Sequence, residues 1–243
     1  MSNFVAEMIG TGLLVLLGNG VVAAVLLHES KGQNSGWIVI TFGWGMAVMV
    51  GVYTVIQFSG AQLNPAVTLA FAMRGTAHGG VAWSTVPARV GGEFVGAFIG
   101  ATLVWLAYWV HWEPTEDAGA KLACFSTGPA IRNPIANFVT EVIGTFVLVI
   151  GVMGIFGNKA PAANGLAPLL VGLLVLGIGL SLGGPTGYAI NPARDLGPRI
   201  MHAILPIPGK GSSDWGYAWI PVVAPLVGAA IASGLYIGVF PGG

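Results

Sequence analysis

The sequence predicts an all-α membrane protein with six transmembrane helices and two re-entrant half-helices, arranged as an inverted repeat. The first observation is composition: 55% of the 243 residues are hydrophobic and only 7% are charged, whereas a soluble domain carries roughly a quarter charged residues. The second is a set of six apolar stretches long enough to cross a bilayer. The third is the tripeptide Asn-Pro-Ala, which occurs twice, each time after a long apolar stretch. The zero net charge argues against nucleic acid as a partner.

The six candidate spans follow one another along the chain. A helix that crosses the bilayer needs about 20 apolar residues, and the stretches that meet this length are Phe4–Leu27, Trp37–Phe58, Ala88–Val110, Pro134–Phe156, Leu166–Gly183 and Tyr217–Phe240. In the third span, glycines recur every four residues at 92, 96 and 100 and indicate a smooth face for a neighbouring helix. Two further segments, Leu63–Ala72, which is apolar, and Pro192–Leu205, are too short to span and are candidates for re-entrant pieces.

The two halves of the chain resemble each other. Glu7-Met-Ile-Gly-Thr-Gly in the first span matches Glu141-Val-Ile-Gly-Thr-Phe in the fourth, and each Asn-Pro-Ala follows the second span of its half. An odd number of spans per repeat inserts the second half upside down relative to the first, as in many transport proteins. We therefore expect one transmembrane channel domain over residues 1–243, with repeats at about 1–112 and 133–243.

Each Asn-Pro-Ala tripeptide predicts the start of a half-helix. Asn is a preferred N-cap, and Pro is favoured at the first helical position because it lacks the N–H that would have no partner there. Because the repeats are inverted, the half-helices enter from opposite faces and meet near the midplane, where two positive N-terminal ends repel cations and protons. The motif residues are Asn64, Pro65, Ala66, Asn191, Pro192 and Ala193.

The Gly-rich segments before the two asparagines, 59–63 and 184–190, are expected to line a pore. Non-helical backbone at membrane depth is tolerated only where it is buried in protein or lines a water-filled cavity. A row of backbone carbonyls suits hydroxyl donors such as water or a polyol, and the amides of Asn64 and Asn191 offer donors to a passing oxygen.

Four of the charged residues within the predicted membrane segments are considered first, because charges there are costly and need a reason. Arg194 follows the second Asn-Pro-Ala and is expected to donate hydrogen bonds into a narrow constriction. Glu7 and Glu141 lie at matching places; they are either a catalytic pair or, as we prefer, acceptors for the backbone N–H groups of the pore loops. Glu93 has no acidic counterpart in the sixth span, and the sequence assigns it no role.

These motifs together resemble the major intrinsic protein family, the aquaporins and glycerol facilitators, along essentially the whole chain. The resemblance implies a pore constriction at Trp44, Gly179, Tyr188 and Arg194, and pore-facing carbonyls at Gly60, Ala61, Gln62, Gly187, Tyr188 and Ala189. Glycerol facilitators carry Trp at the first of these positions, whereas water-selective members usually carry a crowding His where this chain has Gly179. Tyr188 departs from the Phe of the best-known glycerol facilitator type, which makes this corner more polar.

The resemblance implies a passive channel, without enzymatic activity or cofactor, for glycerol and water, and for other small uncharged solutes such as dihydroxyacetone, urea, hydrogen peroxide or protonated lactic acid. It also implies a homotetramer in the bilayer of the cell membrane, with both termini in the cytoplasm. The distribution of Lys and Arg leans towards the opposite orientation, so the expectation about the termini depends on the resemblance alone.

Three other functions compete with this interpretation. A strict water channel would need a bulky residue in place of Gly179. An ion-coupled secondary transporter would need an ionisable residue near the meeting point of the half-helices, where only Arg194 is close. A membrane-embedded enzyme would need a cluster of catalytic groups or an acidic metal-binding motif, and the sequence contains neither.

Overall fold

The structure is a computed structural model of the chain, and it describes residues 1–158 and 164–240. These residues form helices and loops and no strand. The six long helices are α1 (Asn3–Leu26), α2 (Trp37–Ser59), α4 (Val86–Ala107), α6 (Pro134–Gly157), α8 (Ala167–Leu182) and α10 (Ile220–Val239). The shorter ones are α3 (Pro65–Arg74), α5 (Ala118–Ala123), α9 (Pro192–Ile204) and the 3₁₀ turns η1 (Thr76–His78), η2 (Trp83–Thr85) and η3 (Trp109–His111).

Five of the long helices within the described ranges are long and apolar enough to cross a membrane: α1, α2, α4 with the turn before it, α6 and α10. Helix α8 is equally apolar but has 16 residues, which corresponds to about 24 Å against a hydrocarbon core of about 30 Å. It ends early because the chain turns at Gly183 towards the centre of the molecule. The fifth predicted span therefore exists as a helix that is shorter than the other five.

Small residues bring the long helices close together. Helix α1 packs against α4 and α2, α2 packs against α8, and α6 packs against α10. A Cβ atom added at Gly100 of α4 would lie 2.6 Å from the carbonyl oxygen of Gly12 in α1, and one added at Gly45 of α2 would lie 2.8 Å from that of Gly172 in α8. Only glycine allows such close backbone contact, which is the usual means of packing helices in lipid.

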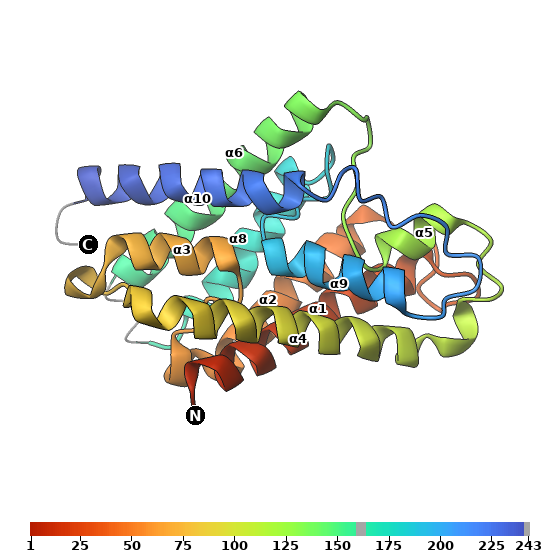
Figure 1. Ribbon diagram of the computed structural model, residues 1–243, viewed down its shortest axis with the longest axis horizontal. Coiled ribbons are helices and arrows are strands. Elements are labelled where there is room, and N and C mark those ends of the chain that lie inside the picture. Colours follow the sequence, from red (N-terminus) through yellow and green to blue (C-terminus); the bar gives the residue numbers. More distant parts are fainter. Residues whose placement is uncertain (159–163, 241–243) are drawn as a thin grey trace.

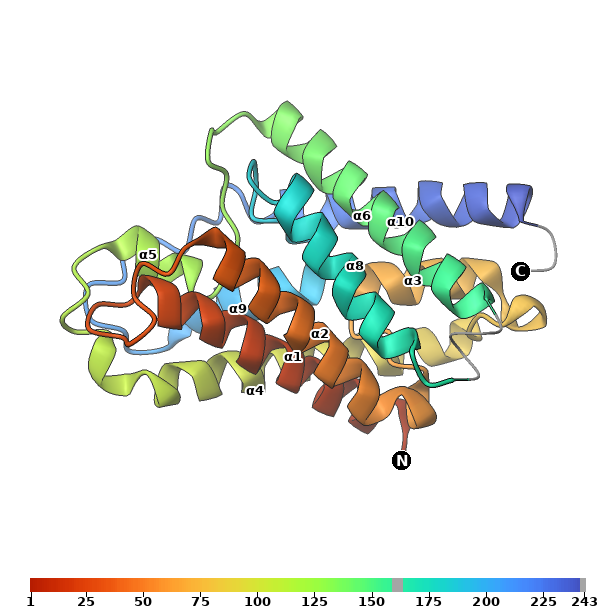
Figure 2. The ribbon, with the colours of Figure 1, turned by 180° about the vertical axis from the view of Figure 1, so that it is seen from behind.

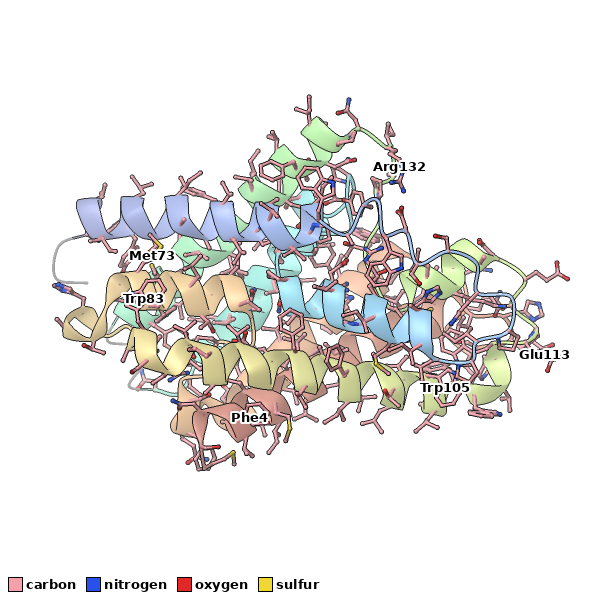
Figure 3. The ribbon with its side chains drawn as sticks, in the orientation of Figure 1. Phe4, Met73, Trp83, Trp105, Glu113 and Arg132 are labelled. Carbon is pink, nitrogen blue, oxygen red and sulfur yellow. The ribbon has the colours of Figure 1, made fainter. Side chains whose placement is uncertain are left out.

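The two half-helices α3 and α9 lie end to end between α10 and α4, in front of the other long helices in Figure 1 and behind them in Figure 2. Each begins as its Asn-Pro-Ala predicts: the N-caps are Asn64 and Asn191, each followed by a proline. The N-terminus of the chain and the end of α10 lie towards the same end of the long axis (Figure 1). The exposed loop residue Glu113 lies at the opposite end (Figure 3).

The outer surface of the helices is apolar. Large hydrophobic side chains are exposed on every long helix, for example Leu17, Ile38, Leu103, Ile143, Leu180 and Ile231. Conversely, the interior holds buried charged groups, which include Glu7, Arg89, Glu93, Glu141, Arg194, Asp195 and Arg199. A soluble protein has the reverse distribution, so the arrangement fits a bundle surrounded by lipid with a polar interior.

Candidate pore

The asparagine of each Asn-Pro-Ala motif binds the residue that precedes the other motif. Nδ2 of Asn64 donates to the carbonyl of Ile190 (2.8 Å), and Nδ2 of Asn191 donates to the carbonyl of Leu63 (2.8 Å). The side-chain oxygen of each Asn caps its own half-helix and accepts from the N–H of Ala66 or Ala193. A carboxamide nitrogen has two N–H groups, so each Asn keeps one donor that no described residue uses.

The loops before the two asparagines have the same unusual backbone. Residues at equivalent positions adopt left-handed conformations: Gly60 and Gly187 (φ 81° and 82°), Ala61 and Tyr188 (51° and 40°), and Leu63 and Ile190 (53° and 43°). A non-glycine residue in this region costs about 1–2 kcal/mol, so the surroundings must hold the loops in place. The left-handed residues also interrupt helical hydrogen bonding, which leaves backbone N–H groups in need of partners.

The two buried glutamates supply these partners. The carboxylate of Glu7 accepts from the N–H groups of Gln62 (3.2 Å) and Leu63 (2.7 Å). The carboxylate of Glu141 accepts from those of Ala189 (2.9 Å) and Ile190 (2.8 Å). Each glutamate therefore holds one loop by two adjacent N–H groups at equivalent positions of the repeat.

Two cavities lie along the line of the half-helices. The pore cavity is lined mainly by apolar residues of α1, α2, α6 and α8, by both asparagines, and by the loop residues Ala61, Gln62 and Ala189. The vestibule is lined by residues of α1 and α2 and by the loops at 126–130 and 183–187, which include Gly187. Of the predicted carbonyl-bearing residues, only Gly60 lines neither cavity.

Three residues line both cavities and therefore mark the boundary between them: Trp44, Tyr188 and Arg194. The guanidinium carbon of Arg194 lies 3.9 Å from the centre of the Trp44 ring, in a cation–π contact. Nη1 of Arg194 and the hydroxyl of Tyr188 are buried and have no partner among the described residues. The boundary between the two cavities thus combines two aromatic side chains with a guanidinium.

Gly179 contributes to this boundary by admitting Tyr188. A Cβ atom added at Gly179 would lie 2.8 Å from Cζ of Tyr188 and 2.9 Å from Cγ2 of Thr41, and a Cβ at Gly183, one turn later, would also overlap the Tyr188 ring. Trp37 completes this slot, because its ring meets that of Tyr188 edge-on at 5.8 Å. The space that a side chain at 179 would fill is therefore occupied by the phenol ring of Tyr188.

The family model described as major intrinsic protein matches residues 1–236. The chain belongs to this family. Relatives include the probable glycerol uptake facilitator protein of Thermotoga maritima, 58% identical over 97% of this chain and 98% of that protein. The glycerol uptake facilitator protein of Bacillus subtilis is 52% identical over 100% and 86%, and the D/L-lactic acid transporter of Lactiplantibacillus plantarum is 41% identical over 97% of each chain.

The fold of this family is found in a solved structure, the aquaglyceroporin from Plasmodium falciparum. It matches with a TM-score of 0.83 and 28% identity over 98% of this chain and 96% of that one. The predicted fold class, an aquaporin-like helical membrane protein, is thereby confirmed. The family membership and the long apolar helices make the chain a multi-pass membrane protein.

Asp195 and Arg199 of α9 bind the loop at 126–130, which lines the vestibule. The carboxylate of Asp195 accepts from the N–H (2.7 Å) and hydroxyl (2.6 Å) of Thr127 and from Nε of Arg199 (2.9 Å). Arg199 in turn donates to the carbonyls of Thr127 and Ser213. All of these groups are buried, so the ion pair fixes the loop that lines the vestibule.

Glu93, to which the sequence assigns no role, lies on α4 beside the first half-helix, α3. Its Oε1 accepts from the hydroxyl of Thr68 (2.6 Å), whereas Oε2 is buried without a partner in the described part of the chain. Burying an unpaired polar group costs free energy, and burying a charge costs more. Glu93 therefore supports α3 through one bond at the expense of an unsatisfied second oxygen.

We expect Glu93→Gln to unfold at the same temperature as the wild type or higher. The oxygen of the amide still accepts from the Thr68 hydroxyl, and the substitution removes a buried ionisable group. Glu93→Ala is expected to unfold at a lower temperature, because it leaves a cavity and an orphaned Thr68 hydroxyl, each worth about 1–3 kcal/mol. Thermal unfolding of the purified protein in detergent measures both. Equal losses in the two variants would contradict this account.

Proposed function

We propose that this chain is a passive channel that conducts glycerol and water down their concentration gradients and excludes ions and protons. The observation that carries the proposal is the constriction, where Trp44 and Tyr188 line the same boundary as Arg194, whose guanidinium lies against the Trp44 ring. Such a wall suits glycerol, which has carbon on one side and hydroxyls on the other. Relatives named glycerol uptake facilitators match nearly the whole chain at 52% and 58% identity, which supports the same solute.

The pore cavity is suited to a polyol along its length. Its wall is mainly apolar, with Val48, Val52, Val152, Val171 and Val175 among its residues, and its polar groups come from the two loops, the asparagines and Arg194. The free N–H of each Asn is a donor to a hydroxyl oxygen, and the loop carbonyls are acceptors for a hydroxyl proton. A solute that offers both can exchange its water shell for these groups as it passes.

The half-helices supply the barrier to ions. Each N-terminal end carries the equivalent of roughly half a positive charge. The two ends meet at Asn64 and Asn191, each of which donates to the carbonyl of the residue before the other. The guanidinium of Arg194 adds a full positive charge nearby. Cations and protons are therefore repelled in the middle of the pore, whereas uncharged solutes are not.

The proposal is tested with purified protein in liposomes that are exposed to a glycerol gradient. We expect fast shrinkage from water efflux, followed by fast re-swelling as glycerol enters, with no change in internal pH under an imposed proton gradient. Empty liposomes are the control. Shrinkage without re-swelling would establish a strict water channel, and glycerol uptake that depends on the proton gradient would establish a coupled transporter.

Protonated lactic acid is a second candidate solute, because one relative is named a D/L-lactic acid transporter and the wall of the pore cavity is mainly apolar. We expect lactic acid flux to rise as pH falls, since the mainly apolar pore cavity disfavours the charged lactate and admits the uncharged acid. Uptake of labelled lactate at several pH values measures this. A flux that does not change with pH would contradict passage of the neutral acid.

We further propose a homotetramer with one pore per subunit and with both termini in the cytoplasm. The wide apolar surface of the helices supports contact with lipid and with other copies. Cross-linking in the membrane measures the number of copies. Protease access to a tag at the N-terminus of the chain in intact cells measures the orientation.

A further inference from the structure

A polar network behind the first pore loop centres on Arg89 of α4, which is buried. Nε donates to the hydroxyl of Thr85 (3.2 Å). Three acceptors converge on Nη1: the carbonyl of Ser59 (2.6 Å), Oε1 of Glu7 (3.2 Å) and the side-chain oxygen of Gln62. The second repeat has Pro221 at the position equivalent to Arg89, so this network exists on one side of the asparagines only.

The arginine decides which way the Gln62 amide faces. A guanidinium has donors and no acceptor, so Gln62 can bind Arg89 only through Oε1. Its Nε2 must then point away from Arg89. Nε2 donates to no described residue and is not among the buried polar atoms without a partner. Gln62 itself lines the pore cavity, which leaves the solute or water in that cavity as the partner of Nε2.

The charge of Arg89 has its own partner. The carboxylate of Glu7, 3.2 Å from Nη1, is fully buried and forms an ion pair with the arginine. Arg89 does not line the pore cavity. Its effect on a passing solute is therefore exerted through the direction of the Gln62 amide rather than through its charge.

We propose that Nε2 of Gln62 donates a hydrogen bond to a hydroxyl oxygen of the passing polyol, and that Arg89 is a positioning residue that holds the amide in this orientation. The inference rests on the proposed glycerol conduction and deepens it. The known donors lie at the asparagines and at Arg194. Gln62 adds a donor in the first loop, beside the carbonyl acceptors of Ala61 and of Gln62 itself. A hydroxyl of the solute can therefore both accept and donate a hydrogen bond in this half of the pore.

The test compares Gln62→Met with the wild type in liposomes, and measures glycerol and water permeability on the same vesicles. Loss of one hydrogen bond is expected to lower glycerol permeability about three- to tenfold and water permeability by less, so the ratio of glycerol to water falls. Gln57→Met is the matched control, because Gln57 is exposed on α2. A ratio equal to that of the wild type would overturn the inference.

A double-mutant cycle tests the role of Arg89. Arg89→Met is expected to lower the glycerol-to-water ratio as Gln62→Met does, and to lower it no further in a Gln62→Met background, because both changes remove the same bond. Arg89→Lys, which still donates to Oε1, is expected to recover most of the loss. Independent losses that multiply in the double variant would overturn the positioning role.

The Gln62→Met arm keeps the inference testable even if Arg89→Met fails to fold. A wild-type protein that conducts water and no glycerol would instead overturn the proposed function. The two failures are therefore distinguishable.

Discussion

Replacing Gly179 with His is expected to reduce glycerol permeability about tenfold or more and water permeability by a smaller factor. The imidazole would occupy the slot that now holds the Tyr188 ring, since even a Cβ atom there would lie 2.8 Å from Cζ of Tyr188. The ring is then forced towards Trp44 and Arg194, the residues that line both cavities. A narrower boundary penalises glycerol more than water, and a barrier higher by roughly 1.4 kcal/mol slows passage tenfold.

The matched control for this prediction is Gly177→His on the same helix. Gly177 is exposed, and a Cβ atom there would meet nothing within 4 Å, so its glycerol and water permeabilities should stay close to those of the wild type. Adding Tyr188→Ala to Gly179→His should restore part of the glycerol flux, because the displaced ring is removed. Equal losses of glycerol and water permeability in Gly179→His would contradict a role for this position in selectivity.

The helices could be predicted because their signals are local. The start of each half-helix is determined by an N-cap asparagine and the proline after it, and these starts are observed at Pro65 and Pro192. The ends of the spans differ where turns compete with the apolar pattern. Helix α10 starts at Ile220 rather than at Tyr217, because the N–H groups of Tyr217 and Ala218 bond to the carbonyls of Asp214 and Trp215 in turns.

The site could be predicted less completely, because its remaining features depend on contacts between distant segments. The sequence gives no sign that Tyr188 occupies the slot beside Gly179, which depends on how the second loop folds back on α8. Arg89 lies near the start of a span and is indistinguishable in sequence from an arginine that reaches the lipid headgroups. Its true partners, Glu7, Ser59 and Gln62, come from α1, α2 and the first loop.

Glu141→Ala is expected to abolish glycerol conduction and to lower the unfolding temperature strongly. The carboxylate is 1% exposed and accepts from the N–H groups of Ala189 and Ile190. Without it, two buried donors lose their partner at about 1–3 kcal/mol each. In the same loop, Tyr188 and Ile190 adopt left-handed conformations (φ 40° and 43°). Because such conformations are costly for non-glycine residues, we expect the released loop to leave them. Glycerol uptake in liposomes and thermal unfolding in detergent measure the two effects.

Two further variants separate loop support from a general effect of removing a glutamate. The glycerol uptake and the unfolding temperature of Glu141→Gln should lie between those of Glu141→Ala and the wild type. The amide oxygen still accepts from one backbone N–H, whereas the NH₂ group is a donor and cannot accept from the other. Glu113→Ala changes an exposed loop residue and should leave both conduction and the unfolding temperature unchanged. If Glu141→Ala unfolded at the wild-type temperature and still conducted glycerol, the second loop would be held by its own packing. The equivalence of Glu7 and Glu141 as supports of the two loops would then fail as well, since each acts through two adjacent backbone N–H groups at equivalent positions of its own loop.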